Sequence, residues 1–183
     1  PLARADGDEP PENGTTHFSV VDGQGNAVSY TSTIEGAFGS GLHWGGFYLN
    51  NELTDFSSSP DVNGVPVANR VEGGKRPRSS MAPTIGMQEG KPVIAAGSPG
   101  GSRMIGDVAQ ALVGMIDWGL DPQQAINMPH LINRFGTFDI EAGTEAEALE
   151  PYLQQRGFKT EIRDLNSGLH IIRITDQGLI DGA

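Results

Sequence analysis

The sequence predicts a single α+β layered sandwich. Strand-like runs dominate the first half of the chain, helix-like segments follow in the middle, and strand-like runs return at the end, which is the order expected for such a fold. A chain of 183 residues is long enough to bury a core as one domain. Its 26 Gly and 12 Pro favour turns and shaped loops over long helices.

The first strands begin abruptly at Thr15. Residues 1–14 are polar and rich in Pro, Asp and Glu, and we expect a flexible tail there. The chain starts with Pro rather than Met, so we expect it to be a piece of something longer. After the tail, THFSVV and AVSYTST read as strands on either side of DGQGN at 22–26, and this combination predicts a β-hairpin.

The middle of the chain predicts loops, a second hairpin and a helix. A Gly-rich loop at 36–46 and a polar stretch at 57–76 precede PTIGMQ and VIAAGS, which should form a hairpin around 89–92. Apolar residues near helical spacing then predict a helix at 102–117, with the side chains of Met104, Ile105, Val108, Leu112, Met115 and Ile116 along it.

Two further helices are indicated by their start signals. Asp121-Pro122 predicts an N-cap followed by a first-turn proline. The TEAE segment at 144–147 predicts a capping box for a helix that ends near Gly157, and Pro151 should kink or split that helix. FKTEIR, HIIRIT and the terminal LID predict late strands, the last two joined through a turn at 176–178.

Composition excludes several classes of function. The formal net charge of −11 and a sequence pI near 4.6 argue against a nucleic-acid partner, whose phosphates need clustered Lys and Arg. The chain has no Cys, and its four His lack the paired spacing of a metal site, so we expect no metal. No run is long and apolar enough to span a membrane, and the first residues lack the pattern of a signal peptide.

Five segments, taken together, resemble the γ-glutamyltransferase family of N-terminal nucleophile hydrolases. Each motif alone is weak, but all five stand in the family's order, and the resemblance runs from Thr15 to the end of the chain. The segments are TTHFSV at 15–20, YTSTI at 30–34 with Phe38-Gly39, NNELTDF at 50–56, KRPRSSM at 75–81 and GSPGGSR at 97–103.

The resemblance implies a four-layer αββα sandwich that is completed by a large subunit absent from this chain. Members of this family are made as one precursor that cuts itself before a Thr, which here is the Gly14–Thr15 bond. Residues 1–14 would then be the end of the large subunit or a precursor linker, and 15–183 the catalytic small-subunit domain. Cleavage frees the α-amine of Thr15, whose reference pKa near ~8 lets it act as the base that activates the Thr15 hydroxyl.

The resemblance also implies roles for residues around the nucleophile. Thr33 matches the residue whose hydroxyl orients Thr15, although it equally fits an ordinary strand-forming role. Gly100 and Gly101 match the oxyanion hole, since glycine lets backbone N–H groups approach a reacting carbonyl closely. Their ordinary alternative is a strand-to-helix turn with no ligand.

The remaining matches concern the substrate. Ser79 and Ser80 match the pair that holds its α-carboxylate, and Asp55, helped by Glu52, matches the site for its α-ammonium group. Glu35 stands where many members of the family have Asn, and it could contact the same amine. Taken singly, each of these residues also fits a solvated loop position. The stretch 57–74 lies where some members carry a lid.

The activity implied by the resemblance is γ-glutamyl transfer from glutathione-like γ-glutamyl amides to water, amino acids or peptides, without any cofactor. Two alternatives remain open at this stage. One is a cephalosporin (glutaryl) acylase of the same fold, and the other is an unprocessed, non-catalytic homologue that acts as a binding module. The resemblance is compatible with a periplasmic or secreted protein as well as with a cytoplasmic one.

Overall fold

The computed structural model describes residues 14–134, 136–165, 167–175, 177–178 and 180–183. Residues 1–13 of the expected tail lie outside these ranges, and so does Asp176 of the expected last turn.

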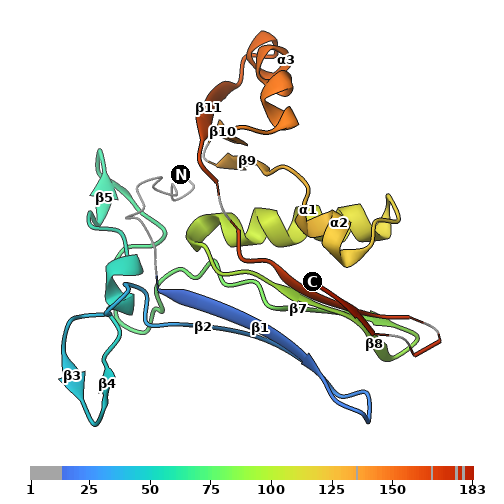
Figure 1. Cartoon of the computed structure of the whole chain (residues 1–183). Coiled ribbons are helices and arrows are strands. Elements are labelled where there is room, and N and C mark those ends of the chain that lie inside the picture. Colours follow the sequence, from blue (N-terminus) through green and yellow to red (C-terminus); the bar gives the residue numbers. More distant parts are fainter. Residues whose placement is uncertain (1–13, 135, 166, 176, 179) are drawn as a thin grey trace.

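The main body of the fold has three layers (Figure 1). Helices α1 (Met104–Ile116) and α2 (Pro122–Ile126) cover one face of a four-stranded sheet, and a two-stranded sheet lies against the other face. The main core lies between the helices and the four-stranded sheet, and its buried members are Ile94, Ala96, Val108, Ala111, Met115, Ala125, Leu169 and Ile171. The α+β layered sandwich expected from the sequence is confirmed.

The two-stranded sheet is the predicted first hairpin. Strands β1 (Thr15–Val21) and β2 (Ala27–Thr33) pair antiparallel in a register that places Thr15 opposite Thr33. In the turn, Asp22 Oδ1 accepts hydrogen bonds from the backbone N–H groups of Gln24 and Asn26, both at 2.9 Å. An Asp side chain that binds the backbone following it stabilises a tight turn, which explains why this segment reverses the chain.

The polarity of this sheet is inverted relative to an ordinary surface hairpin. Successive side chains alternate between the two faces. Those facing the four-stranded sheet are mostly polar, and they include His17, Ser19, Ser29 and Thr31. The outer face is apolar, with side chains 46–51% exposed at Phe18, Val20, Val28 and Tyr30. A contiguous row of half-exposed apolar side chains is typical of a surface that another layer covers.

The four-stranded sheet has the order β13-β12-β8-β7, and every pair in it is antiparallel. Its strands are β7 (Thr84–Gln88), β8 (Lys91–Gly97), β12 (His170–Ile174) and β13 (Ile180–Gly182). The predicted second hairpin and the last two predicted strands are thereby confirmed. Ser29 Oγ joins the two sheets, because it accepts from the Thr84 N–H at 3.1 Å and donates to the Ala96 carbonyl at 2.8 Å.

The predicted helices form, with some differences in detail. A 3-10 turn, η2 (Gly101–Arg103), leads into α1. Along α1, Met104, Val108 and Met115 are buried as expected, whereas Ile105 and Ile116 are 55% and 67% exposed. At α2, the N-cap Asp121 and Gln124 form a complete capping box, with Pro122 in the first turn.

A second, smaller unit follows, in which a three-stranded sheet of order β11-β10-β9 carries helix α3 (Figure 1). Sequence reasoning predicted β11 (Lys159–Arg163) but missed β9 (Leu131–Arg134) and β10 (Thr137–Glu141). Strand β10 pairs antiparallel with β9 and parallel with β11. Its parallel partner lies beyond a helical segment, so no tight turn marks the pairing in the sequence.

The helical segment of this unit agrees with the prediction only in part. It is split into a 3-10 stretch, η3 (Glu145–Leu149), and the short α3 (Glu150–Gln155), as expected from Pro151. The capping box is incomplete. Thr144 Oγ1 accepts from the N–H of Ala146, while the Glu147 carboxylate accepts from the N–H of Gly143 instead of Thr144.

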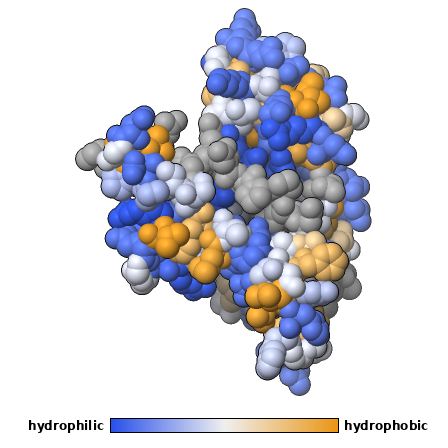
Figure 2. Space-filling view, turned by 90° about the vertical axis from the view of Figure 1, so that its left-hand side faces the viewer, coloured by the Kyte–Doolittle hydropathy of each residue, from blue (hydrophilic) through white to orange (hydrophobic). Residues whose placement is uncertain are grey.

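The expected loops between 36 and 76 contain three small elements. Two are paired dipeptide strands, β3 (His43–Trp44) with β4 (Phe47–Tyr48) and β5 (Asp61–Val62) with β6 (Val65–Pro66). Between them lies the 3-10 helix η1 (Glu52–Asp55). The face seen in Figure 2 carries separate apolar patches among hydrophilic surface. The large apolar side chains between 36 and 76 that are at least 59% exposed are Phe38, Leu42, Trp44, Phe47, Leu53 and Val71.

Candidate functional site

The candidate nucleophile is held by its strand partner. Because β1 and β2 place Thr15 opposite Thr33, Thr15 Oγ1 donates a hydrogen bond to Thr33 Oγ1 at 3.0 Å. Thr33 Oγ1 also accepts from the backbone N–H of Glu35 at 2.8 Å. Two donors therefore converge on one hydroxyl oxygen, which fixes the direction in which the Thr15 hydroxyl points.

The residue before Thr15 lies tightly against the turn that follows β2. A Cβ atom added to Gly14 would lie 2.3 Å from the Glu35 carbonyl oxygen and 2.6 Å from that of Gly36. Glu35 itself has φ of 72°, a left-handed conformation that is uncommon for a residue with a side chain. The Gly14–Thr15 peptide bond therefore lies in a crowded corner between β1 and this turn.

An asparagine outside the predicted set organises the turn. The buried Glu35 carboxylate accepts a hydrogen bond from Asn51 Nδ2, and Asn51 Oδ1 accepts from the Gly36 N–H at 2.9 Å. Asn51 also precedes η1, which carries the predicted substrate residues Glu52 and Asp55. One side chain thus links the turn next to Thr15 with the helix that presents both carboxylates.

A second asparagine, Asn69, links Asp55 to the serine pair. Its Nδ2 donates to the Asp55 carbonyl at 2.6 Å, and its Oδ1 accepts from the backbone N–H of Arg78 at 3.0 Å. Ser79 and Ser80 follow directly. The two asparagines therefore connect the segments that carry the predicted residues from Gly14 to Ser80, although three loops separate these residues in the sequence.

Gly100 and Gly101 form the turn that follows β8. Their φ angles are 126° and 67°, conformations that residues with a side chain rarely adopt, so glycine is required for this turn between β8 and η2. The beginning of β1 and this turn lie at the same end of the stacked sheets (Figure 1). His17, two residues after Thr15, packs so tightly on Gly97 at the end of β8 that a Cβ there would lie 2.1 Å from the His17 ring.

His17 is a buried group that sequence reasoning considered only as a metal ligand. Its Nδ1 is 2.7 Å from Thr31 Oγ1, and its Nε2 is 3.2 Å from Ser19 Oγ. Burial, with a smaller contribution from the nearby His170, holds the pKa of His17 below its ordinary value. A neutral imidazole therefore lies between the two sheets and fixes the spacing of β1 over the end of β8.

Within the described ranges, the structure has no group of three or more His, Asp or Glu side chains that could hold a metal ion. None of the helices in these described ranges is both long and apolar enough to cross a membrane.

Comparisons with known proteins bear on this arrangement. The sequence model of the family described as Gamma-glutamyltranspeptidase matches residues 2–183. The glutathione hydrolase proenzyme of Escherichia coli K12 is 39% identical over 180 residues, which are 93% of this chain but 31% of that protein. The chain therefore spans about a third of this relative. The Acylase ACY 1 proenzyme of Pseudomonas sp. SE83 is 33% identical over 173 residues, 92% of this chain and 30% of that protein.

Among solved structures, a mutant of γ-glutamyltranspeptidase from Helicobacter pylori matches with a TM-score of 0.79 at 34% identity. The match covers 92% of this chain and 97% of that chain. Nearly the whole of that chain therefore shares the layered arrangement described above. This agrees with the expected N-terminal nucleophile hydrolase sandwich.

Proposed function

The chain belongs to the γ-glutamyltranspeptidase family, and from this premise we propose that it is the catalytic small-subunit part of a γ-glutamyl-transferring enzyme. Its substrates are glutathione-like γ-glutamyl amides, and the acyl acceptor is water, an amino acid or a peptide. The E. coli glutathione hydrolase proenzyme is 39% identical to this chain and the acylase 33%, which favours γ-glutamyl over glutaryl transfer.

The observation that carries the proposal is the Thr15–Thr33 hydrogen bond directly after Gly14. In the precursor, the Thr15 hydroxyl attacks the Gly14 carbonyl carbon, the peptide bond breaks, and the Gly14 acyl group moves to the Thr15 oxygen. Water then hydrolyses this ester, which leaves a Gly14 carboxylate and a free Thr15 amine. Residues 1–14 thereby become separate from a catalytic domain at 15–183.

In turnover, the free amine of Thr15 accepts the hydroxyl proton as the oxygen attacks the γ-carbonyl carbon of the substrate. Thr33 orients that oxygen. The negative charge of the tetrahedral intermediate develops at the end of β8, where the backbone N–H groups of Gly100 and Gly101 and the start of η2 stabilise it. The amine of the broken γ-glutamyl amide bond then leaves. The acceptor afterwards releases the γ-glutamyl group from Thr15.

The connected group around Asn51 and Asn69 supports a substrate pocket. The carboxylates of Glu52 and Asp55 bind the α-ammonium group, and Glu35, whose carboxylate accepts a hydrogen bond from Asn51, contacts the same group. The hydroxyls of Ser79 and Ser80 bind the α-carboxylate. These assignments follow the family's motif at the matching positions, and the two asparagine bridges hold the matching positions near one another.

A large subunit from the same precursor completes the enzyme in this proposal. The outer face of the β1–β2 hairpin is apolar and half-exposed, and a fourth layer packed on it would bury Phe18, Val20, Val28 and Tyr30. The 31% share of the E. coli relative that the chain spans is consistent with a missing partner of greater length.

Hydrolysis of a γ-glutamyl anilide by protein that contains both subunits tests the proposal. We expect turnover by the processed wild type and none by Thr15→Ala. A wild type that hydrolyses the matched glutaryl anilide faster would identify an acylase instead. A wild type that remains uncut and inactive towards both substrates would identify the non-catalytic homologue.

A further inference from the structure

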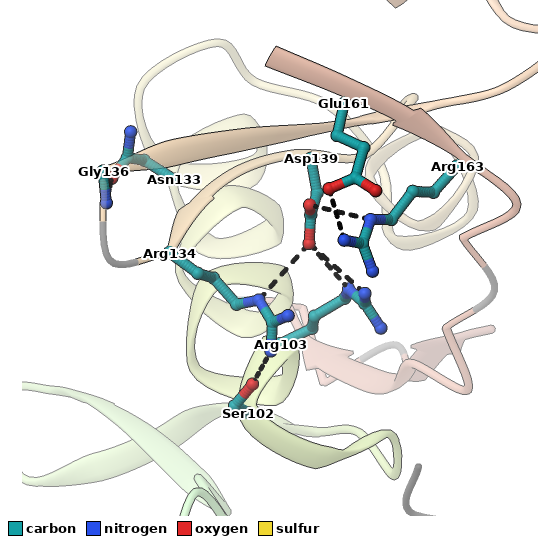
Figure 3. Close-up of polar contacts among 8 residues, drawn as sticks. All are labelled: Ser102, Arg103, Asn133, Arg134, Gly136, Asp139, Glu161 and Arg163. Atoms are coloured by element: carbon teal, nitrogen blue, oxygen red, sulfur yellow. Dashed lines mark hydrogen bonds and ion pairs between the residues drawn. The ribbon is translucent and has the colours of Figure 1, made fainter. Parts of the chain in front are cut away.

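A buried carboxylate outside the site described above holds three arginines. Asp139 on β10 is 2% exposed (Figure 3). Its Oδ2 accepts from Arg103 Nη2 at 3.2 Å, Arg103 Nε at 3.3 Å and Arg134 Nε at 3.3 Å, while Oδ1 lies 3.3 Å from Arg163 Nε. Arg163 also pairs with Glu161 on the surface side. A buried carboxylate with this many donors is fully compensated and has one well-defined orientation.

The sheet register explains how two of the three arginines reach Asp139. Asp139 lies opposite Ile132 on β9 and Glu161 on β11, so Arg134 and Arg163 are its diagonal neighbours on the same face. This face lies under the start of α1. A Cβ atom added to Gly106 would lie 3.0 Å from Ile132, so the glycine lets the helix approach β9 closely. The third arginine, Arg103, comes from η2 above the same face.

Two of these connections lead directly to the Gly100–Gly101 turn. Arg103 is the last residue of η2, and Ser102, which immediately follows Gly101, accepts a hydrogen bond from Arg134 Nη1 (Figure 3). Arg134 itself is bound to Asp139. The carboxylate therefore holds the segment after the two glycines at two adjacent residues. The Arg163 connection leads away from the turn, to β11 and Glu161.

We propose that Asp139 is a positioning residue for the oxyanion-stabilising turn. It fixes Ser102 through Arg134 and binds Arg103 directly, and so it sets the direction of the Gly100 and Gly101 N–H groups. This inference rests on the proposed function for its catalytic consequence, whereas the structural constraint on the turn does not. Such a constraint matters because glycine has the greatest backbone freedom, and two consecutive glycines with positive φ lie between β8 and α1.

A positional role and a purely electrostatic role of Asp139 predict opposite changes in kcat for Asp139→Asn. Asp139→Asn removes a negative charge and leaves three arginines, so the surroundings of the turn become more positive. If the cluster acted through its charge, this change would favour an oxyanion and raise kcat. If the cluster acts by position, the misdirected N–H groups lower kcat. Losing one such donor entirely lowers kcat by roughly 10²–10³, so misdirection should cost less, about tenfold.

The test compares three variants of the two-subunit protein. Asp139→Asn should lower kcat by about tenfold or more with KM for the γ-glutamyl anilide changed less than about twofold. Ser102→Ala removes only the link from the turn to Arg134, and it should lower kcat without lowering the thermal unfolding midpoint. Arg163→Gln breaks a contact of the same carboxylate that does not lead to the turn, and it should leave kcat unchanged even where it lowers the unfolding midpoint.

Hydrogen–deuterium exchange supplies a readout that does not depend on activity. Amides in 100–104 should exchange faster in Asp139→Asn and Ser102→Ala than in the wild type, and at the wild-type rate in Arg163→Gln. Unchanged exchange and kcat in Asp139→Asn, a raised kcat, or equal losses of kcat in Asp139→Asn and Arg163→Gln would each overturn the inference. An inactive wild type with the expected exchange pattern would refute the proposed function and leave the positional role standing.

Discussion

Replacing Gly14 by alanine should slow self-cleavage of the precursor, because the new methyl group would clash with the backbone carbonyls of Glu35 and Gly36. The added Cβ would lie 2.3 Å from the Glu35 carbonyl oxygen, so an ordinary contact of 3.4 Å requires the junction or the turn to shift by about 1.1 Å. The turn resists such a shift, since Thr33 Oγ1 binds the Glu35 N–H and Asn51 Oδ1 binds the Gly36 N–H. The scissile carbonyl must therefore move.

A misplacement of about 1 Å relative to an attacking group can cost roughly 10²-fold in rate. We expect a loss of this order for Gly14→Ala, measured as the disappearance of precursor on denaturing gels. Gly23→Ala is the matched control, since a Cβ there meets nothing within 4 Å. Once the bond is cut, Gly14 no longer precedes Thr15, so the turnover number per processed molecule should equal that of the wild type. Cleavage of Gly14→Ala at or above the wild-type rate would refute the reasoning.

Three further results are expected. Thr15→Ala should abolish turnover, whereas processed Thr33→Ala should retain measurable hydrolysis of γ-glutamyl anilide, because Thr33 only orients the nucleophile; complete loss in both would contradict this assignment. The wild type should prefer γ-glutamyl to glutaryl anilide by about tenfold or more in kcat/KM, and Asp55→Asn should reduce that preference, since it removes a charge-assisted contact with the α-ammonium group; an unchanged ratio would place the ammonium site elsewhere. The buried His130 has its Nδ1 3.1 Å from Asp107 Oδ1, and this carboxylate raises the pKa of His130, so the stabilising contribution of the pair should be full below the ordinary pKa near ~6.5 and lost as pH rises through the raised value. In urea unfolding, the excess stability of wild type over His130→Gln should therefore shrink with rising pH, and a constant difference would argue against the pair.

The first hairpin was predictable because local signals and the fold agree there. A turn in which Asp22 binds the following backbone lies between two β-rich runs of equal length, and that alone sets a register that places Thr15 opposite Thr33. What the sequence does not show is which face is inside. The polar face of the hairpin, including His17, points towards the rest of the chain, which is the reverse of what hydrophobicity alone would suggest.

Strands β9 and β10 were missed for a related reason. Their inward-facing positions include the half-buried Arg134 and the buried Asp139, and charged residues at inward-facing positions break the alternation by which a half-buried strand is recognised. The same charges form the cluster that holds the Gly100–Gly101 turn. A local departure from the strand pattern thus coincides with a candidate functional feature.

The site residues were predicted by family resemblance, but the residues that hold them in place were not. Asn51 and Asn69 lie in loops, where asparagine commonly serves a turn, and nothing in their spacing indicates that they bridge three separate segments. The left-handed conformation of Glu35 was equally invisible in the sequence. These features depend on contacts between residues far apart in the chain, and such contacts emerge only in the fold.

We propose above all that Thr15 becomes the N-terminal nucleophile. Intact-mass measurement and N-terminal sequencing of the purified, active protein test it most directly. We predict two polypeptides, the smaller beginning at Thr15, and a single precursor mass for Thr15→Ala. A small subunit that begins at any other residue, or turnover by protein that remains uncut, would contradict it.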